Sequence, residues 1–124
     1  MILRTKNIGN ATVVNLHGRL DLFEAEQVEK DLFEIAESTR DNHMIIVLEG
    51  LDYLSSSGLR IFISLRRFLN LSGRRLLLCN KNNNAVNIFL KIINIKDMLT
   101  LYKTEEEAIL QCGGGKKTRA DKIA

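Results

Sequence analysis

Three consecutive serines, Ser55, Ser56 and Ser57, lie between an apolar stretch and a glycine in the segment LDYLSSSGLRIF. Their hydroxyl groups allow three kinds of chemistry. A serine oxygen caps a helix by accepting an unpaired backbone N–H of the first turn. A serine also acts as a nucleophile when a base activates it, or as the acceptor of a phosphoryl group. The surrounding sequence bears differently on each of these possibilities.

The catalytic interpretation lacks the partners that it needs. A nucleophile elbow has glycine two residues before the serine and two residues after it, whereas Ser56 has Gly58 after it but Leu54 before it. The histidines of the sequence, His17 and His43, lie in strand-like runs without a recognisable acid partner. We therefore expect that the protein is not an enzyme.

A helix cap and a phosphorylation switch both fit the sequence. A helix N-terminus presents unpaired N–H groups and the positive end of the helix dipole, so it tolerates a dianion at Ser56 without unfolding. The phosphate would add about two negative charges to a surface that otherwise docks a partner. The spacing of the serines alone leaves both interpretations open.

The elements that position the serines follow from the apolar periodicity. Strands are expected in the runs MILRT, TVVNLHG, HMIIVLEG, RRLLLCN and LTLY. Helices are expected over residues 22–38, 56–71, 83–94 and 104–112. The order β-β-α-β-α-β-α-β-α predicts an α/β fold: a mostly parallel sheet of about five strands, with an antiparallel N-terminal edge strand and about four helices.

In a parallel sheet, each turn from a strand to a helix lies at the carboxyl edge, where ligands and partners usually bind. Three such turns converge there, at residues 18–21, 51–58 and 79–84. The serines belong to the middle turn, and Asp21 ends the first. Asp21 is followed three residues later by Glu24, which is typical of a capping box.

The helix after the serines has one face that is expected to pack on the core, formed by Gly58, Ile61, Phe62, Leu65, Phe68 and Leu69. Leu59 and Ile63 fall off that face as an i, i+4 apolar pair. Exposed beside a switchable charge, the pair would form a docking ridge. Packing under a neighbouring loop or helix is the other possibility, and the sequence leaves the two open.

The net charge of +3 arises at the C-terminal end of the chain. Residues 113–124 carry four basic residues and one acid, whereas residues 1–112 carry equal numbers of basic and acidic groups. We predict one domain over residues 1–112 and a flexible basic tail over 113–124. Because the domain shows no basic stripe, direct binding to nucleic acid is not expected.

The remaining features favour a cytoplasmic protein without a cofactor. No apolar run is long enough to cross a bilayer, and the first residues lack the pattern of a signal peptide. Cys79 and Cys112 match no metal or redox spacing, so free thiols are expected. The glycines at 113–115 lack the residues of a phosphate-binding loop, and nucleotide binding is left undecided.

Taken together, these residues resemble a known family. The order of elements, GRLD after the second strand, and LDYLSSSGLR entering a helix are similar to the STAS domain, the anti-sigma factor antagonist family, over residues 1 to about 111. The family's recurring segment is Asp-Ser or Ser-Ser, a small residue, Gly and Leu. Aligned on this sequence, it places the phosphorylated serine at Ser56. Ser55 is the alternative, because many switchable members have aspartate in its place.

The resemblance implies a regulator that is switched by phosphorylation. The unphosphorylated protein would bind an anti-sigma factor, often itself a serine-protein kinase, and so release a sigma factor. The kinase would phosphorylate Ser56 and a phosphatase would reset it, with no insertion into a membrane. The implied partner-binding residues are Asp21, Ser55, Ser57, Gly58, Leu59, Ile63, Asn80 and Asn82. Other members are subunits of lipid-transport ABC systems or of stress-signalling assemblies, and such a subunit would bind its partner without a phospho-switch.

Overall fold

The computed structural model describes residues 1–92 and 99–113. Its strands are β1 (Ile2–Ile8), β2 (Ala11–Leu20), β3 (His43–Leu54), β4 (Leu76–Cys79) and β5 (Thr100–Tyr102). Its helices are α1 (Leu22–Ser38), α2 (Ser56–Asn70), α3 (Asn84–Ile92) and α4 (Glu105–Gly113). The sheet order is β1-β2-β3-β4-β5, with β1 antiparallel to β2 and the other pairs parallel. The predicted fold class is confirmed.

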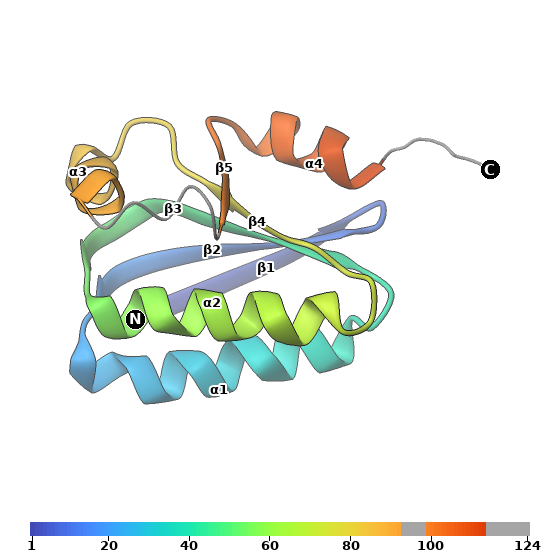
Figure 1. Ribbon diagram of the computed structural model, residues 1–124, viewed down its shortest axis with the longest axis horizontal. Helices are drawn as coiled ribbons and strands as arrows, with labels where there is room; N and C mark the ends of the chain where they lie inside the picture. The colour runs from blue at the N-terminus through green and yellow to red at the C-terminus, as the bar shows by residue number, and fades with distance from the viewer. Residues whose placement is uncertain (93–98, 114–124) are drawn as a thin grey trace.

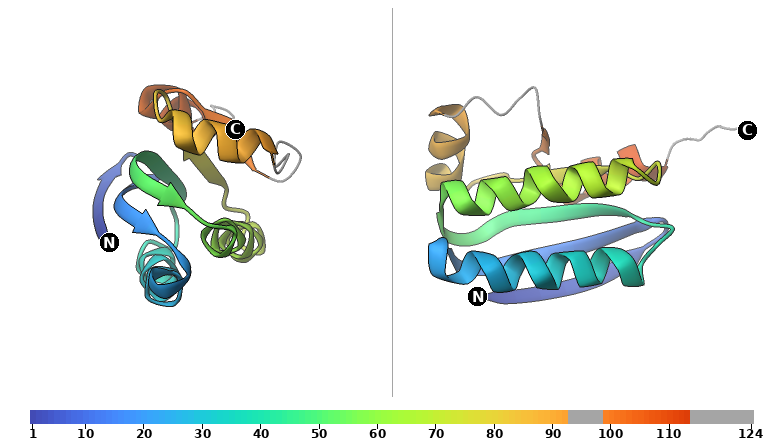
Figure 2. Two further views of the ribbon diagram at one scale, coloured as in Figure 1. Left: turned by 90° about the vertical axis from the view of Figure 1, so that its left-hand side faces the viewer. Right: turned by 60° about the horizontal axis from the view of Figure 1, so that its bottom comes forward.

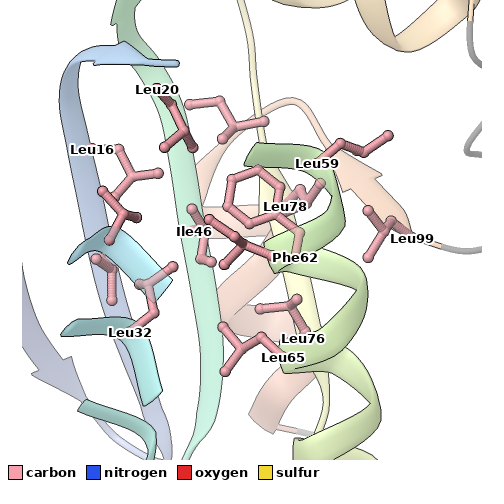
Figure 3. Packing of buried hydrophobic residues seen from close by; sticks show 14 of the residues in the cluster. Leu16, Leu20, Leu32, Ile46, Leu59, Phe62, Leu65, Leu76, Leu78 and Leu99 are labelled. Atoms are coloured by element: carbon pink, nitrogen blue, oxygen red, sulfur yellow. The ribbon is translucent and has the colours of Figure 1, made fainter. Parts of the chain in front are cut away.

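The helices form a layer on each face of this sheet. α1 and α2 lie side by side over one face, while α4 lies over the other (Figure 1). The larger core cluster lies under α1 and α2 and includes Leu16, Ile46, Phe62 and Leu78 (Figure 3). A smaller cluster, which includes Ala108 of α4, fills the opposite face. Burying a large apolar side chain in such a core contributes about 1.5–3 kcal/mol, so the two clusters fix the helices on the sheet.

β3 is longer than the sequence predicted. The apolar run suggested a strand over residues 43–50, whereas the strand continues to Leu54. Its pairing with β2 shifts twice, first between Asn15 and His17 and again between Gly18 and Arg19, and each shift adds one residue to β3. Leu51 and Leu54 are therefore both buried in the larger cluster, although three residues apart. A regular strand would send them to opposite faces.

The chain after α3 is only partly covered by the structure. The helix predicted over 83–94 is observed as Asn84–Ile92, and its last two residues lie outside the described residues. The predicted tail also lies outside them, apart from Gly113, which ends α4. In the part of the chain that the structure describes, no helix is long and apolar enough to cross a membrane.

Candidate functional site at the carboxyl edge of β2 and β3

The three serines have different environments at the start of α2. Ser55 is the N-cap, and its hydroxyl oxygen accepts the backbone N–H of Gly58 at 3.1 Å. The backbone N–H of Ser55 donates to the carbonyl oxygen of Leu20 at 2.9 Å, which ties the start of the helix to the end of β2. Ser56 is the first helical residue and is exposed, and its hydroxyl has no hydrogen-bond partner among the described residues. Ser57 is half-buried.

Gly58 is buried because α2 begins in direct contact with the ends of β2 and β3. A Cβ at this position would lie 2.6 Å from Leu20 Cγ and 3.0 Å from Leu54 Cδ1. Both distances are shorter than ordinary van der Waals contacts, so a larger residue would push the helix away. Gly58 thus sets the position of the serines, and its own atoms are not available to a partner.

Leu59 does not form an exposed ridge, which was one of the two possibilities left open by the sequence. It is only 9% exposed and belongs to the larger core cluster. Leu59 is covered because that cluster extends beyond the sheet to Leu90 of α3 and to Leu99. Figure 3 shows Leu99 on the flank of α2 that lies away from Ile46. Ile63 is half-buried and also packs against this cluster. Packing under a neighbouring element, the alternative left open by the sequence, is what the structure shows.

Asp21 lies at the same edge as the serines. It is the N-cap of α1, and its Oδ1 accepts the backbone N–H of Glu24 at 3.0 Å, as the sequence predicted. Its Oδ2 lies 3.9 Å from Nε of Arg19, and the guanidinium of Arg19 lies 4.6 Å from the ring centroid of Tyr53. Because the backbone of Leu20 is hydrogen-bonded to that of Ser55, Arg19 and Asp21 lie next to the start of α2.

Exposed apolar side chains complete this edge, and sequence reasoning did not single them out. Phe23 is 89% exposed, Leu22 is 70% exposed and Tyr53 is 43% exposed. Phe23 and Leu22 begin α1 next to Asp21, while Tyr53 precedes the serines in β3. The available signal was that neither Leu22 nor Phe23 falls on the apolar face of α1. We call the surface formed by Asp21, Leu22, Phe23, Tyr53 and Ser56 the serine edge.

The asparagine-rich turn after β4 is mostly occupied in holding the fold. Asn80 is 3% exposed, against the expectation that it lines a contact surface. Its Nδ2 donates to Asn87 Oδ1 at 2.7 Å, while its Oδ1 has no partner among the described residues. Asn83 Nδ2 donates to the carbonyl oxygen of Leu51 at 2.7 Å, which joins the turn to β3. Of the two predicted partner-binding residues in this turn, Asn80 and Asn82, only Asn82 is exposed.

The amino-acid sequence matches a family model over most of its length. The model of the STAS domain aligns with residues 3–108. The chain belongs to the STAS domain family.

Two relatives of this STAS chain are named as anti-sigma factor antagonists. It is 26% identical over 100 residues to the anti-sigma-B factor antagonist of Bacillus subtilis (strain 168), covering 81% of this chain and 89% of the relative. It is 23% identical over 99 residues to the anti-sigma F factor antagonist of Paenibacillus polymyxa, covering 80% and 84%.

Solved structures of the anti-sigma factor antagonist SpoIIAA share the fold. The unphosphorylated form aligns with a TM-score of 0.68 at 22% identity, covering 92% of this chain and all of that one. The phosphorylated form from Bacillus aligns with a TM-score of 0.63 at 22% identity, covering 89% and 98%.

Other reactive groups of this STAS chain lie away from the serine edge. His43 accepts the backbone N–H of Arg75 on its Nδ1 at 2.9 Å. Burial lowers the pKa of His43 below its usual value, and the positive charges of Arg75 and Arg74 act in the same direction. Both cysteines are buried free thiols, and burial raises the pKa of Cys79 and of Cys112 to about 11. Within residues 1–92 and 99–113, no three His, Cys, Asp or Glu side chains cluster as metal ligands would.

Proposed function

We propose that this STAS chain is an anti-sigma factor antagonist that binds its partner at the serine edge and is released when Ser56 is phosphorylated. The observation that carries the proposal is the different environment of two adjacent serine hydroxyls. The hydroxyl of Ser55 is engaged as the helix cap, whereas that of Ser56 is exposed on the first turn of α2. Ser56 is therefore the phosphate acceptor, and Ser55, the alternative from the sequence, keeps its structural role.

The position of Ser56 suits a switch that leaves the fold intact. A phosphate there would lie at the positive end of the α2 dipole, near unpaired N–H groups of the first turn. No core contact of the domain would change, because Ser56 is exposed and belongs to neither core cluster. The fold can therefore carry either state of the serine, as the two solved forms of the SpoIIAA protein illustrate for that protein.

The same edge provides what a partner would bind. Phe23 and Leu22 offer exposed apolar surface, and Asp21 adds a carboxylate beside them. A phosphate on Ser56 would add about two negative charges next to this surface, which a docked partner would have to desolvate. Binding to the unmodified protein and release of the modified one follow from that cost.

The partner in this proposal is an anti-sigma factor that is itself a serine-protein kinase, and a phosphatase resets the switch. The named relatives support the choice of an anti-sigma factor, since both are named as antagonists of anti-sigma factors; the kinase and the phosphatase follow from the proposed phosphorylation of Ser56. The chain itself would act in the cytoplasm by binding and not by catalysis. Of the predicted partner residues, Asp21, Ser57, Ile63 and Asn82 keep some exposure, while Gly58, Leu59 and Asn80 would act by placing the others.

The test incubates the chain with ATP and the anti-sigma factor kinase of the source organism. It then measures how tightly the kinase binds the Ser56 variants. We expect phosphate on the tryptic peptide that ends at Arg60, and fragmentation should place it on Ser56. Ser56→Asp should weaken binding by tenfold or more, about 1.4 kcal/mol, whereas Ser56→Ala should bind but accept no phosphate. Asn70→Asp, which adds the same charge at the opposite end of α2, is the matched control and should bind normally.

Two results would contradict the proposal. Ser56→Asp binding as tightly as the wild type would remove the electrostatic switch. A peptide that stays unmodified under all growth conditions and with the kinase would leave permanent binding to a partner as the function.

A further inference from the structure

The charges of the α1–α2 layer are segregated by helix. α1 carries six acidic residues and one lysine. α2 carries three arginines, Arg60, Arg66 and Arg67, and no acid. The two helices run in the same direction side by side, and both outer surfaces face the viewer in the right-hand view of Figure 2. One half of this layer is therefore negative and the other half positive.

Most of these charged side chains form no ion pair within the described residues. On α1, Glu24 pairs with the N-terminal amine at 3.4 Å, but no ion pair involves the exposed Glu26, Glu29, Glu34 or Glu37. The three arginines of α2 are exposed and likewise have no acidic partner in that part of the chain. The layer is therefore complementary in charge to a surface that places positive charge opposite α1 and negative charge opposite α2.

A second copy of the chain has that pattern under one symmetry only. If a two-fold axis ran across the helices, α1 would face α1 of the copy and acids would face acids. An axis parallel to the helices places α1 against α2 of the copy, and α2 against its α1. The interface is then isologous and closed, so that it forms a dimer and not a filament. Opposite charges facing each other favour this orientation over the first.

The most exposed apolar side chains lie at the two ends of the layer. Phe23 is 89% exposed at the start of α1, and Leu71 is 88% exposed just after α2. Near Leu71, a surface cavity of about 350 Å³ opens between the C-terminal ends of the helices; Glu37, Arg40, Phe68, Leu71, Ser72 and Arg74 line it. An axis parallel to the helices brings C-terminal ends together, so Leu71 of the copy meets this cavity.

We infer that the α1–α2 layer is a homodimer interface, with the two-fold axis parallel to the helices. Helices of 17 and 15 residues give an outer surface of about 500 Å² per copy at 1.5 Å rise per residue. A total of about 1,000 Å² lies at the lower end of specific interfaces, so the dimer is reversible and depends on concentration. The inference does not require the proposed function, although both surfaces include Phe23.

The experiment is sedimentation velocity on the purified chain alone, from about 10 µM to about 500 µM and at about 0.05 M and about 0.5 M salt. The wild type should dimerise with increasing concentration, and high salt should raise the dissociation constant about tenfold or more. A basic-side variant, Arg60→Glu with Arg67→Glu, and an acidic-side variant, Glu26→Lys with Glu37→Lys, should each be monomeric. Mixing the two variants should restore a dimer, because each reversed helix then faces a reversed partner.

Matched controls separate the layer from general charge effects. Arg4→Glu with Lys103→Glu makes the same charge change away from the layer and should dimerise like the wild type. Leu71→Asp should weaken the dimer, whereas Leu110→Asp, an exposed leucine on α4, should not. Circular dichroism checks that each variant is folded.

Three results would overturn the inference. A wild type that stays monomeric over the whole concentration range would show that no such interface forms. A dimer that responds to neither salt nor the reversals would place the interface elsewhere. Two monomeric variants that fail to associate when mixed would exclude the pairing of α1 with α2.

Discussion

Nη1 of Arg74 donates to the carbonyl oxygen of Ala36 at 2.8 Å and so joins the turn after α2 to the end of α1. The same nitrogen lies 3.0 Å from the carbonyl oxygen of Thr39, and Nε donates to Ser72 Oγ at 3.1 Å. The arginine is 7% exposed. A buried cation thus satisfies carbonyls that a helix leaves unpaired at its C-terminus, and it supports the dipole of α1.

Replacing Arg74 should therefore destabilise the whole helical layer. We expect Arg74→Met to lower the free energy of unfolding by about 2–4 kcal/mol, because hydrogen bonds to a charged group are lost and buried carbonyls are left unpaired. Urea denaturation measures the change. Arg4→Met, on an exposed position of β1 away from the helical layer, should stay within about 0.5 kcal/mol of the wild type. Equal effects of the two substitutions would mean that the capping contacts contribute nothing.

Replacing Ser55 or Ser56 should change the stability of the protein by different amounts, because only Ser55 caps the helix. Ser55→Ala removes the acceptor of the Gly58 N–H and should cost about 1 kcal/mol. Ser56→Ala removes an exposed hydroxyl and should change stability by less than about 0.5 kcal/mol. Thermal or urea unfolding compares them directly. A larger loss of stability for Ser56→Ala than for Ser55→Ala would show that Ser55 is not the residue that caps α2.

Gly58→Ala should loosen the start of α2. The new methyl group would meet Leu20 Cγ at 2.6 Å, and overpacking of this kind costs about 1–3 kcal/mol. Combining it with Leu20→Ala should cost less than the sum of the two single changes, because the contact is then relieved. Strict additivity in this double-mutant cycle would show that the two positions do not press on each other.

His43 should make stability depend on pH below neutrality. Its pKa in the folded protein lies below the ordinary value of 6.5, so the unfolded chain binds the proton more readily. The contribution of His43 is therefore fully present above pH 6.5 and is lost as the pH falls toward the folded pKa. Protonation of Nδ1 would also remove the acceptor of the Arg75 N–H.

The measurement is the free energy of unfolding at several pH values between neutral and mildly acidic. The wild type should lose stability relative to His43→Gln as the pH falls through this window. A difference between wild type and His43→Gln that is constant with pH would contradict the prediction.

Local patterns were sufficient to predict the order of elements and the cap of α1. Apolar runs identified the buried strands, and Asp21 with Glu24 gave the start of α1, because each signal lies within a few neighbouring residues. The topology placed Asp21 and Ser55 at one edge of the sheet, and the hydrogen bond from Ser55 to Leu20 confirms that they are neighbours.

The features that were missed depend on contacts between distant segments. Leu59 is buried because elements some thirty residues later close over α2, and no helical periodicity encodes that cover. The extension of β3 depends on register shifts against β2, which place Leu51 and Leu54 on one face. The sequence suggests that Asn80 is an accessible polar residue in a turn. In the structure its side-chain amide donates a hydrogen bond to Asn87 of α3, and it is buried.

The backbone around Ser56 has a consequence for any enzyme that modifies it. The preceding residue donates to Leu20 of β2, and its carbonyl oxygen accepts the N–H of Leu59, so the segment is held by the sheet on one side and by the helix on the other. An enzyme that binds its substrate as an extended peptide would first have to detach the start of α2 from β2 and unwind its first turn. Recognition must instead be of an assembled surface, and a synthetic peptide with the same residues would be a poor substrate.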